Sequence, residues 1–249
     1  MFHQQFCWKN YNNGQHFRIH RGKSHMIKDN KKIRAMLRVG LFSLITFCAC
    51  TPISGMAAST AELQQAQRVF TQLASQSMVR ANFIQQKQIA SVNKIFKSTG
   101  QVVFAKNVGV LWNIQSPVQA DLIMTEYALV QKTANTQNKI TLDKSQYAAV
   151  ANVFLQLMSG NQKTLLQNFD LQSVQMGQGA MATWQIRLTP KSAMLKKLFQ
   201  QVEASGGQYV QRIVIHEKSN SITTIQFNQQ RNQPQQLSSS ENALFQLAK

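Results

Sequence analysis

The segment 81–117 constrains the fold of this chain more than any other part of the sequence. Apolar residues recur at every second position along it, as at Val102 and Phe104 and again at Val110 and Trp112. This period places the apolar side chains on one face of a strand and the polar ones on the other. The pattern is typical of antiparallel strands with one buried and one solvated face. The segment therefore predicts a sheet with a broad apolar face, which other parts of the chain or a ligand must cover.

The same alternation continues through most of the chain. Within 81–117, Gly100 and Gly109 mark places where the backbone must turn, bulge or approach a neighbour closely. Short strands in unbroken succession favour a meander, in which strands that follow one another in sequence pair with one another. The predicted strands are 79–88, 96–106, 109–115, 118–125, 128–133, 136–142, 170–176, 181–189, 200–205, 208–217 and 222–228.

Helical periodicity interrupts this meander. Ser59 and Glu62 form an S-x-x-E capping box, which predicts a helix over 60–77. A helix capped by Asp143 and ended by Ser159-Gly160, followed by a second over 162–168, interrupts the strands midway. Because these two helices cannot join the sheet, we expect them to lie across its apolar face. Shorter helical stretches are expected at 193–199 and 241–248, and the polar tail 229–240 is expected to be a loop.

The first 57 residues are predicted to be a leader, followed by one domain over 58–249. The twelve-residue apolar run Val39–Cys50 follows a basic segment and precedes small residues, as in a secretory signal peptide cleaved after Ala57. Residues 1–25 are unlike the start of a signal peptide, so translation from Met26 or Met36 is the simplest account, with a long basic region as the alternative. Acylation at Cys50 is a second alternative, although Phe47 and Cys48 fit an acylation motif poorly.

The predicted mature chain is basic and poor in catalytic groups. After Ala57 it has 18 Lys and Arg against 8 Asp and Glu, a net formal charge of +10 that would attract anionic partners. The three cysteines all precede the cleavage site, and His216 is the sole histidine after it. No metal-ligand spacing, glycine-rich phosphate loop or aromatic-basic cluster is present. We therefore predict no enzyme activity, no cofactor, no metal and no nucleic-acid partner.

The chain is rich in large apolar side chains on one face of the predicted sheet. Any one of them taken alone is more often a core residue than part of a binding site. Taken together, a helix pair over a curved sheet can leave a cavity for an acyl chain, and each buried CH₂ contributes about 0.8 kcal/mol. The candidate lining residues are Phe83, Phe104, Trp112, Leu122, Met124, Phe154, Leu157 and Trp184.

Several motifs resemble the LolA-type carriers of outer-membrane lipoproteins. They are F-x-Q-x-K from Phe83, Gly100 before a V-x-F strand, G-V-L-W at 109–112 with Pro117, and W-Q-I-R-L-T-P-K from Trp184. The resemblance covers the whole mature chain. It implies an α+β fold in which helices form a lid over the hydrophobic cavity of a strongly curved, incomplete β-barrel. It also implies a periplasmic carrier that takes cargo from an inner-membrane release complex or exporter and delivers it to an outer-membrane receptor.

The chain also departs from that family pattern. Where the family commonly carries an Arg-Pro pair, with the arginine holding the lid closed, this chain has Lys106 and Asn107. Lysine lacks the forked contacts of arginine, so we expect Lys106 to control the lid differently. The segment 237–245, L-S-x-x-E-x-x-x-F, resembles a divergent branch associated with export of acylated or polyene lipids. An acyl-chain lipid other than a lipoprotein is therefore an alternative cargo.

The function that these observations favour is a monomeric periplasmic carrier of acyl chains. An outer-membrane receptor anchored through Cys50 is the alternative within the same class. A secreted basic polyanion-binding protein and a β-rich hydrolase are alternatives from other classes. The salt dependence of binding distinguishes polyanion binding from acyl-chain binding. Added salt screens charge pairing and so weakens polyanion binding, whereas burial of a neutral acyl chain stays nearly unchanged.

Overall fold

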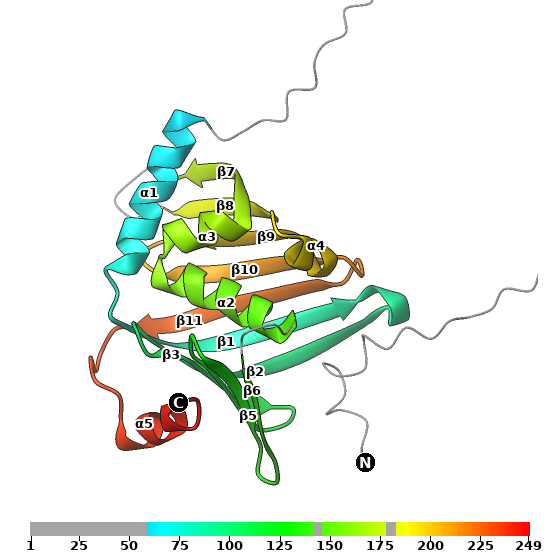
Figure 1. Ribbon diagram of the computed structural model, residues 1–249, viewed down its shortest axis with the longest axis vertical. Coiled ribbons are helices and arrows are strands. Elements are labelled where there is room, and N and C mark those ends of the chain that lie inside the picture. The colour runs from blue at the N-terminus through cyan, green and yellow to red at the C-terminus, as the bar shows by residue number, and fades with distance from the viewer. Residues whose placement is uncertain (1–58, 142–145, 178–182) are drawn as a thin grey trace, which may run out of the picture. The chain divides into compact units, whose positions relative to one another are not determined.

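The computed structural model describes residues 59–141, 146–177 and 183–249 (Figure 1). These residues belong to one compact unit, Gly55–Lys249. The predicted leader, its cleavage site, Cys50 and the expected N-cap Asp143 lie outside the described residues.

In the described part of the chain, eleven strands form one antiparallel sheet. Its order is β6-β5-β4-β3-β2-β1-β11-β10-β9-β8-β7, so two meanders meet where β1 pairs with β11, and β6 and β7 remain unjoined edges. The α+β class with an open, curved antiparallel sheet is thus confirmed (Figure 1). The strands are β1 (Met78–Ile89), β2 (Lys94–Ala105), β3 (Gly109–Ser116), β4 (Ala120–Met124), β5 (Ala128–Lys132), β6 (Gln137–Thr141), β7 (Phe169–Met176), β8 (Trp184–Pro190), β9 (Phe199–Gly206), β10 (Val210–Glu217) and β11 (Ile222–Arg231).

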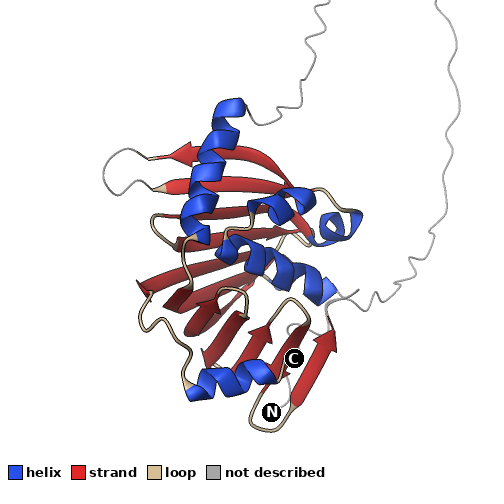
Figure 2. Ribbon diagram, turned by 60° about the vertical axis from the view of Figure 1, so that its left-hand side comes forward, coloured by secondary structure: helices blue, strands red, loops and turns tan. Residues whose placement is uncertain are grey.

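Helices lie on both faces of this sheet. The capping box before α1 is present, with the Ser59 N–H donating to Glu62 Oε2 at 2.8 Å and the Glu62 N–H to Ser59 Oγ at 3.3 Å. Figure 2 shows α1 to α4 over one part of the sheet and α5 apart from them. The helices are α1 (Thr60–Ala74), α2 (Gln146–Ser159), α3 (Gln162–Asn168), α4 (Ala193–Leu198) and α5 (Ser239–Gln246), with a 3₁₀ turn at Ala90–Val92.

The two faces of the sheet bury two separate hydrophobic clusters. Along β2, Val102 and Phe104 enter the larger cluster, which also includes residues of α1 to α4 and which we call the inner core. Val103 and Ala105 point to the opposite face and enter a smaller cluster with residues of the C-terminal segment, here the outer core. The two-residue period of the sequence therefore places alternate side chains in two cores.

The two glycines of the 81–117 segment lie where backbones approach closely. At Gly100, the β2–β3 register shifts, and an added Cβ would lie 1.9 Å from the Asn113 carbonyl oxygen. At Gly109, φ is +149°, and a Cβ would lie 2.1 Å from the Met124 carbonyl oxygen. Both positions therefore require glycine, as the sequence indicates.

The C-terminal tail differs from the prediction. The sequence predicts a strand ending at residue 228 and a loop over 229–240, whereas β11 continues to Arg231 and α5 begins at Ser239. The tail is held by Arg80, a buried residue of β1. Its Nη1 donates to the Pro234 carbonyl at 2.5 Å and its Nη2 to the Gln236 carbonyl at 2.9 Å. A contact between residues more than 150 positions apart orders a polar segment that has no periodic pattern of its own.

Candidate functional site

The eight predicted lining residues come together on the helix-covered face of the sheet. Seven are buried members of the inner core, and Leu122 is half-buried and packs against it. Five strands and one helix contribute them. Whether they line a ligand cavity stays a prediction. They are Phe83 from β1, Phe104 from β2, Trp112 from β3, Leu122 and Met124 from β4, Phe154 and Leu157 from α2, and Trp184 from β8.

Aromatic rings form the centre of this group. The ring centroid of Trp112 lies 4.3 Å from that of Phe83 and 5.0 Å from that of Phe154, the latter at an interplanar angle of 79°. Phe227 of β11 completes the group, at 5.9 Å from Trp112 and 6.2 Å from Phe154. Offset and edge-to-face pairs of this kind stabilise by about 0.5–1.5 kcal/mol each beyond area burial. The rings of the sheet and of α2 thus contact one another directly.

Phe227 is missing from the set of predicted lining residues. Its alternation with Ile225 shows that it belongs to one face of a strand, but not which strands lie beside it. The structure pairs Phe227 with Phe83 across β1 and β11. That pairing joins the first strand to the last, and local periodicity carries no information about such a contact.

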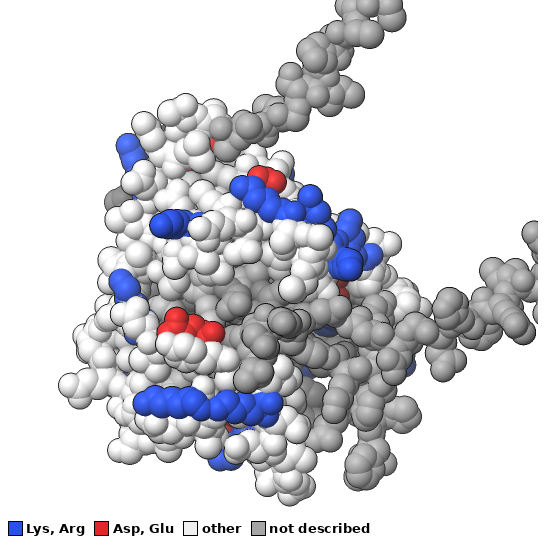
Figure 3. Space-filling view, viewed as in Figure 1, with Lys and Arg blue, Asp and Glu red and all other residues white. Residues whose placement is uncertain are grey.

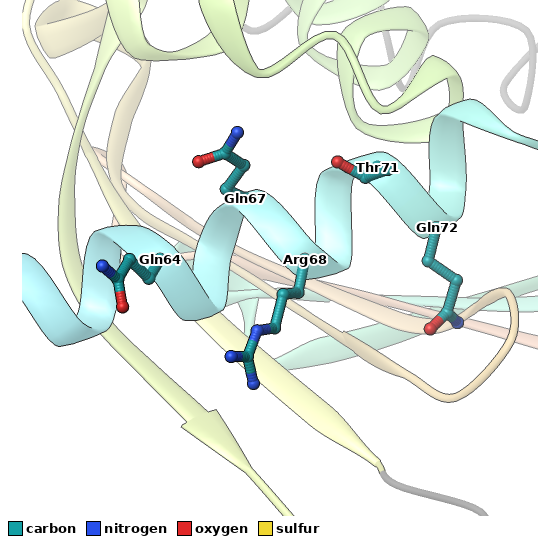
Figure 4. Close-up of a pocket in the computed structure, with 5 residues that line it drawn as sticks. All are labelled: Gln64, Gln67, Arg68, Thr71 and Gln72. Atoms are coloured by element: carbon teal, nitrogen blue, oxygen red, sulfur yellow. The ribbon is translucent and has the colours of Figure 1, made fainter.

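Two hollows lined by described residues lie outside the aromatic group. One, of about 680 Å³, is an open polar groove along the outer surface of α1, between Gln64 and Gln72 (Figure 4). The other, of about 230 Å³, lies on the opposite face of the sheet, between β2–β4 and α5. Between α2 and the sheet, the ring of Phe154 contacts that of Trp112, which in turn contacts Phe83.

The contacts of α2 and α3 with the rest of the protein differ in kind. Among the α2 side chains that the structure describes, 153–159, no hydrogen bond to the sheet is present, and Oε1 of Gln156 is buried without a hydrogen-bond partner. By contrast, α3 is tied to the segment after β8, because Lys191 Nζ donates to the Leu166 carbonyl at 2.9 Å and its N–H to the Asn168 carbonyl at 2.8 Å. An unpartnered buried polar atom costs about 1–3 kcal/mol. The described half of α2 thus contacts the rest of the protein through apolar side chains, whereas α3 also has polar anchors.

The junction between α2 and α3 rests on the last turn of α1. Gly160 ends α2 with φ +63°, and a Cβ there would lie 2.4 Å from the Phe70 carbonyl oxygen and 2.5 Å from the Ala74 nitrogen. Asn161 then caps α3 by accepting from the Thr164 N–H at 3.2 Å. The close backbone contact and the left-handed conformation both require glycine at position 160. The junction therefore holds the end of α2 and the start of α3 against the last turn of α1.

Lys106 lies in the β2–β3 turn and contacts the same turn of α1. Its Nζ donates to the Ala74 carbonyl at 2.5 Å, and its backbone N–H donates to the Ser77 carbonyl at 2.9 Å. These contacts reach the end of α1 and not α2 or α3. Ala74 is also the residue against which Gly160 packs. Any control of α2 by Lys106 would therefore be indirect, through the position of α1.

One ion pair of the described structure fastens the C-terminal tail to β1. Glu241 of α5 pairs with Arg80 at 2.9 Å. Burial raises the pKa of Glu241, but hydrogen bonds from Arg80 and Ser238 and the charge of Arg80 outweigh this, so its pKa lies below the ordinary value. His216 Nε2 lies 3.6 Å from Glu203 Oε1. Within the described ranges, no group of three or more His, Cys, Asp or Glu could hold a metal ion.

These features define a class of protein: an open antiparallel barrel whose apolar inner face is covered by helices. The model of the family described as outer membrane lipoprotein carrier protein LolA matches residues 74–246. The chain therefore belongs to the LolA family, and the resemblance noted in the sequence is confirmed. None of the described helices is long and apolar enough to cross a membrane.

Solved structures with a similar arrangement have low sequence identity to this chain. A LolA superfamily protein from Nitrosomonas europaea is 12% identical with a TM-score of 0.42, covering 70% of this chain and 96% of that one. LprF from Mycobacterium bovis is 10% identical with a TM-score of 0.37, covering 72% and 98%. The lipoprotein LppX from Mycobacterium tuberculosis is 12% identical with a TM-score of 0.38, covering 72% and 97%. The comparison with curated proteins gave no match.

Proposed function

We propose that this protein is a periplasmic carrier that shields the acyl chains of lipoproteins or related lipids and moves them from the inner to the outer membrane. Membership of the LolA family supports this proposal. The observation that carries it is the aromatic contact between α2 and the sheet, in which Trp112 lies between Phe83 and Phe154. The described α2 residues at this interface are apolar and packed into the inner core, so an acyl chain can replace one set of apolar contacts with another.

The proposed mechanism is displacement of α2 from the sheet. The Gly160 junction stays seated on α1, and α3 keeps its hydrogen bonds to Lys191. When α2 moves, the side chains of Phe154, Leu157 and their neighbours leave the sheet, and the acyl chain takes their place against Trp112. The structure described here then corresponds to the closed form without cargo.

The magnitudes agree with reversible binding. Burial of a sixteen-carbon chain at about 0.8 kcal/mol per CH₂ contributes on the order of 10 kcal/mol before ordering costs. Separating α2 from the sheet exposes four large buried side chains, and each exposure costs about 1.5–3 kcal/mol of free energy if the side chain finds no new partner. These side chains are Val153, Phe154, Leu157 and Met158. Because the two amounts are similar, the net affinity stays low enough for cargo to be released to an acceptor.

The donor would be an inner-membrane release complex or exporter, and the acceptor an outer-membrane receptor. The protein would act as a monomer, without a cofactor and without covalent chemistry. Its periplasmic location would follow from cleavage of the leader near Ala57.

Mass spectrometry of protein purified from the periplasm tests this proposal. Under native conditions we expect a population carrying one acylated lipid, which organic extraction releases and identifies. The sequence of the purified N-terminus separates a free carrier from a receptor acylated at Cys50. Protein that carries no lipid, and that also fails to bind added fatty acid, would exclude the carrier function.

A further inference from the structure

The hairpin between β1 and β2 extends beyond the rest of the sheet. On one side, β11 pairs with β1 only as far as Gln88. On the other side, β3 pairs with β2 only from Thr99. The end of this β1–β2 ribbon therefore has no β3 neighbour over 94–98, and its turn, beyond Gln88, also passes the end of β11, as Figure 1 shows. We call residues 90–97 of this ribbon the hairpin tip.

The hairpin tip exposes three large apolar side chains. Their exposed fractions are 55% for Val92, 66% for Ile95 and 39% for Phe96. Ile95 and Phe96 are consecutive in a strand, so their side chains point to opposite faces of the ribbon. Both faces of the tip are thus apolar, and neither belongs to the inner or the outer core. Exposed apolar side chains gathered in this way mark a site of interaction.

Lysines flank these apolar residues. Lys94 and Lys97 are exposed, and the ion pairs among the described residues include neither of them. Lys87, further along the same ribbon, instead pairs with Glu217 at 2.8 Å. The positive charge at the tip is therefore available to an external partner.

The same end of the sheet carries further cations. The Ala90 N–H lies 3.4 Å from Ser221 Oγ in the β10–β11 turn, and the Lys218 N–H of that turn donates to the Leu198 carbonyl at the end of α4 at 2.9 Å. Tip, turn and α4 are thus consecutive neighbours. In Figure 3, a run of Lys and Arg side chains lies over the position of α4. The exposed residues of this docking edge are Val92, Lys94, Ile95, Phe96, Lys97, Met194, Lys196, Lys197 and Lys218.

We propose that the docking edge binds the surface of a membrane that contains anionic phospholipid. The hairpin tip would enter the boundary between headgroups and acyl chains, and the surrounding lysines would contact the phosphates. A protein partner would cover one face of a ribbon, whereas a lipid interface surrounds it. Apolar side chains on both faces, with lysines whose stems can remain in the apolar layer, therefore fit lipid better. This inference goes beyond the proposed function, because it does not depend on what binds under α2.

Flotation with lipid vesicles tests the proposal. The purified protein is mixed with vesicles of phosphatidylcholine, with or without phosphatidylglycerol, and the bound fraction is measured. We expect binding to the anionic vesicles and a decrease as salt is added. Each lysine near an anionic surface contributes about fivefold to binding, so K94Q/K97Q should weaken it on the order of twentyfold. The paired substitution I95S/F96S should weaken it at least about tenfold, because two large apolar side chains no longer enter the lipid.

Matched controls change the same kinds of residue elsewhere. Val108→Ser with Tyr127→Ser removes two exposed apolar side chains from turns at the other end of the strands. Arg68→Gln with Lys163→Gln removes two exposed cations from α1 and α3. Both control variants should bind vesicles as the unchanged protein does.

Three outcomes would overturn the proposal. The unchanged protein could fail to bind anionic vesicles, or the tip variants could bind as well as the controls. The tip variants could also keep vesicle binding while losing a membrane-protein partner, which would make the edge a protein-docking surface. Thermal unfolding of each variant shows that it is folded. Binding of a soluble fatty acid should be the same in the tip variants, so failure of membrane docking is distinguishable from failure of the carrier function.

Discussion

Replacing Phe154 by alanine distinguishes a movable cover from an ordinary core helix. Phe154 is 9% exposed, and its ring lies 5.0 Å from Trp112 and 6.2 Å from Phe227. Truncating a buried phenylalanine costs about 3–5 kcal/mol. In the proposed mechanism, the truncation destabilises the closed form by this amount. The open, loaded form loses less, about 1.5–3 kcal/mol of contact between the ring and the acyl chain.

The difference between these two losses predicts the direction of the change in affinity. A net gain of roughly 1.5 kcal/mol corresponds to about tenfold tighter binding of a fatty acid by Phe154→Ala. Urea unfolding of the same variant should show a free energy of unfolding that is lower by about 3–5 kcal/mol. A protein that becomes less stable but binds its ligand more tightly is the expected signature of a closed cover that opposes binding.

Phe245→Ala is the matched control. Phe245 is 3% exposed and belongs to the outer core, on the face of the sheet away from α2. Its truncation should reduce stability by a similar amount, about 3–5 kcal/mol, and leave fatty-acid affinity unchanged. Equal affinities of the two variants, measured by titration with a fluorescent fatty acid, would refute the reasoning that α2 is displaced by the ligand.

Three further predictions test individual contacts. Gly160→Ala should lower the free energy of unfolding by about 2–4 kcal/mol, because a side chain at φ +63° is strained and would meet the backbone of α1. An unchanged midpoint of urea unfolding would show that the junction can move away from α1. Lys106→Met should lower the free energy of unfolding by about 1 kcal/mol, because the hydrogen bond to the Ala74 carbonyl is lost. If α1 positions α2, this variant should also release fatty acid faster in stopped-flow measurements, and an unchanged release rate would exclude control of α2 by Lys106. The pKa of Glu241 is lowered in the folded protein, so its pairing with Arg80 stabilises the fold fully above the ordinary glutamate pKa of about 4.3, and this stabilisation is lost as pH falls through the folded pKa. Glu241→Gln should therefore flatten the acid limb of a profile of thermal stability against pH, and an unchanged limb would contradict this role of the pair.

Much of the fold follows from local patterns. The alternation around Phe104 and Trp112 predicts strands with two distinct faces, and the structure places those faces in the inner and outer cores. The S-x-x-E pattern at Ser59 predicts a helix start, and both hydrogen bonds of the capping box are present. These features depend on interactions within a few residues, which is why sequence spacing reveals them.

Other features depend on long-range contacts, and the sequence does not predict them. The pairing of Phe83 with Phe227, and the clamp of Arg80 on the tail, join the two ends of the domain. Periodicity also cannot say whether an apolar face encloses a cavity or is filled by rings, because that depends on side-chain volumes summed over several elements. The approach of Phe154 to Trp112 is such a case: both residues were predicted, and the direct contact between their rings was not.

Fluorescence quenching of Trp112 tests the central claim most directly. In a protein that starts at Ala58, Trp184→Phe leaves Trp112 as the sole tryptophan, at the contact between α2 and the sheet. A brominated sixteen-carbon fatty acid should quench its emission to saturation at one molecule per protein, and the unbrominated acid should not. Binding of the brominated acid without quenching of Trp112 would place the ligand elsewhere and contradict the account.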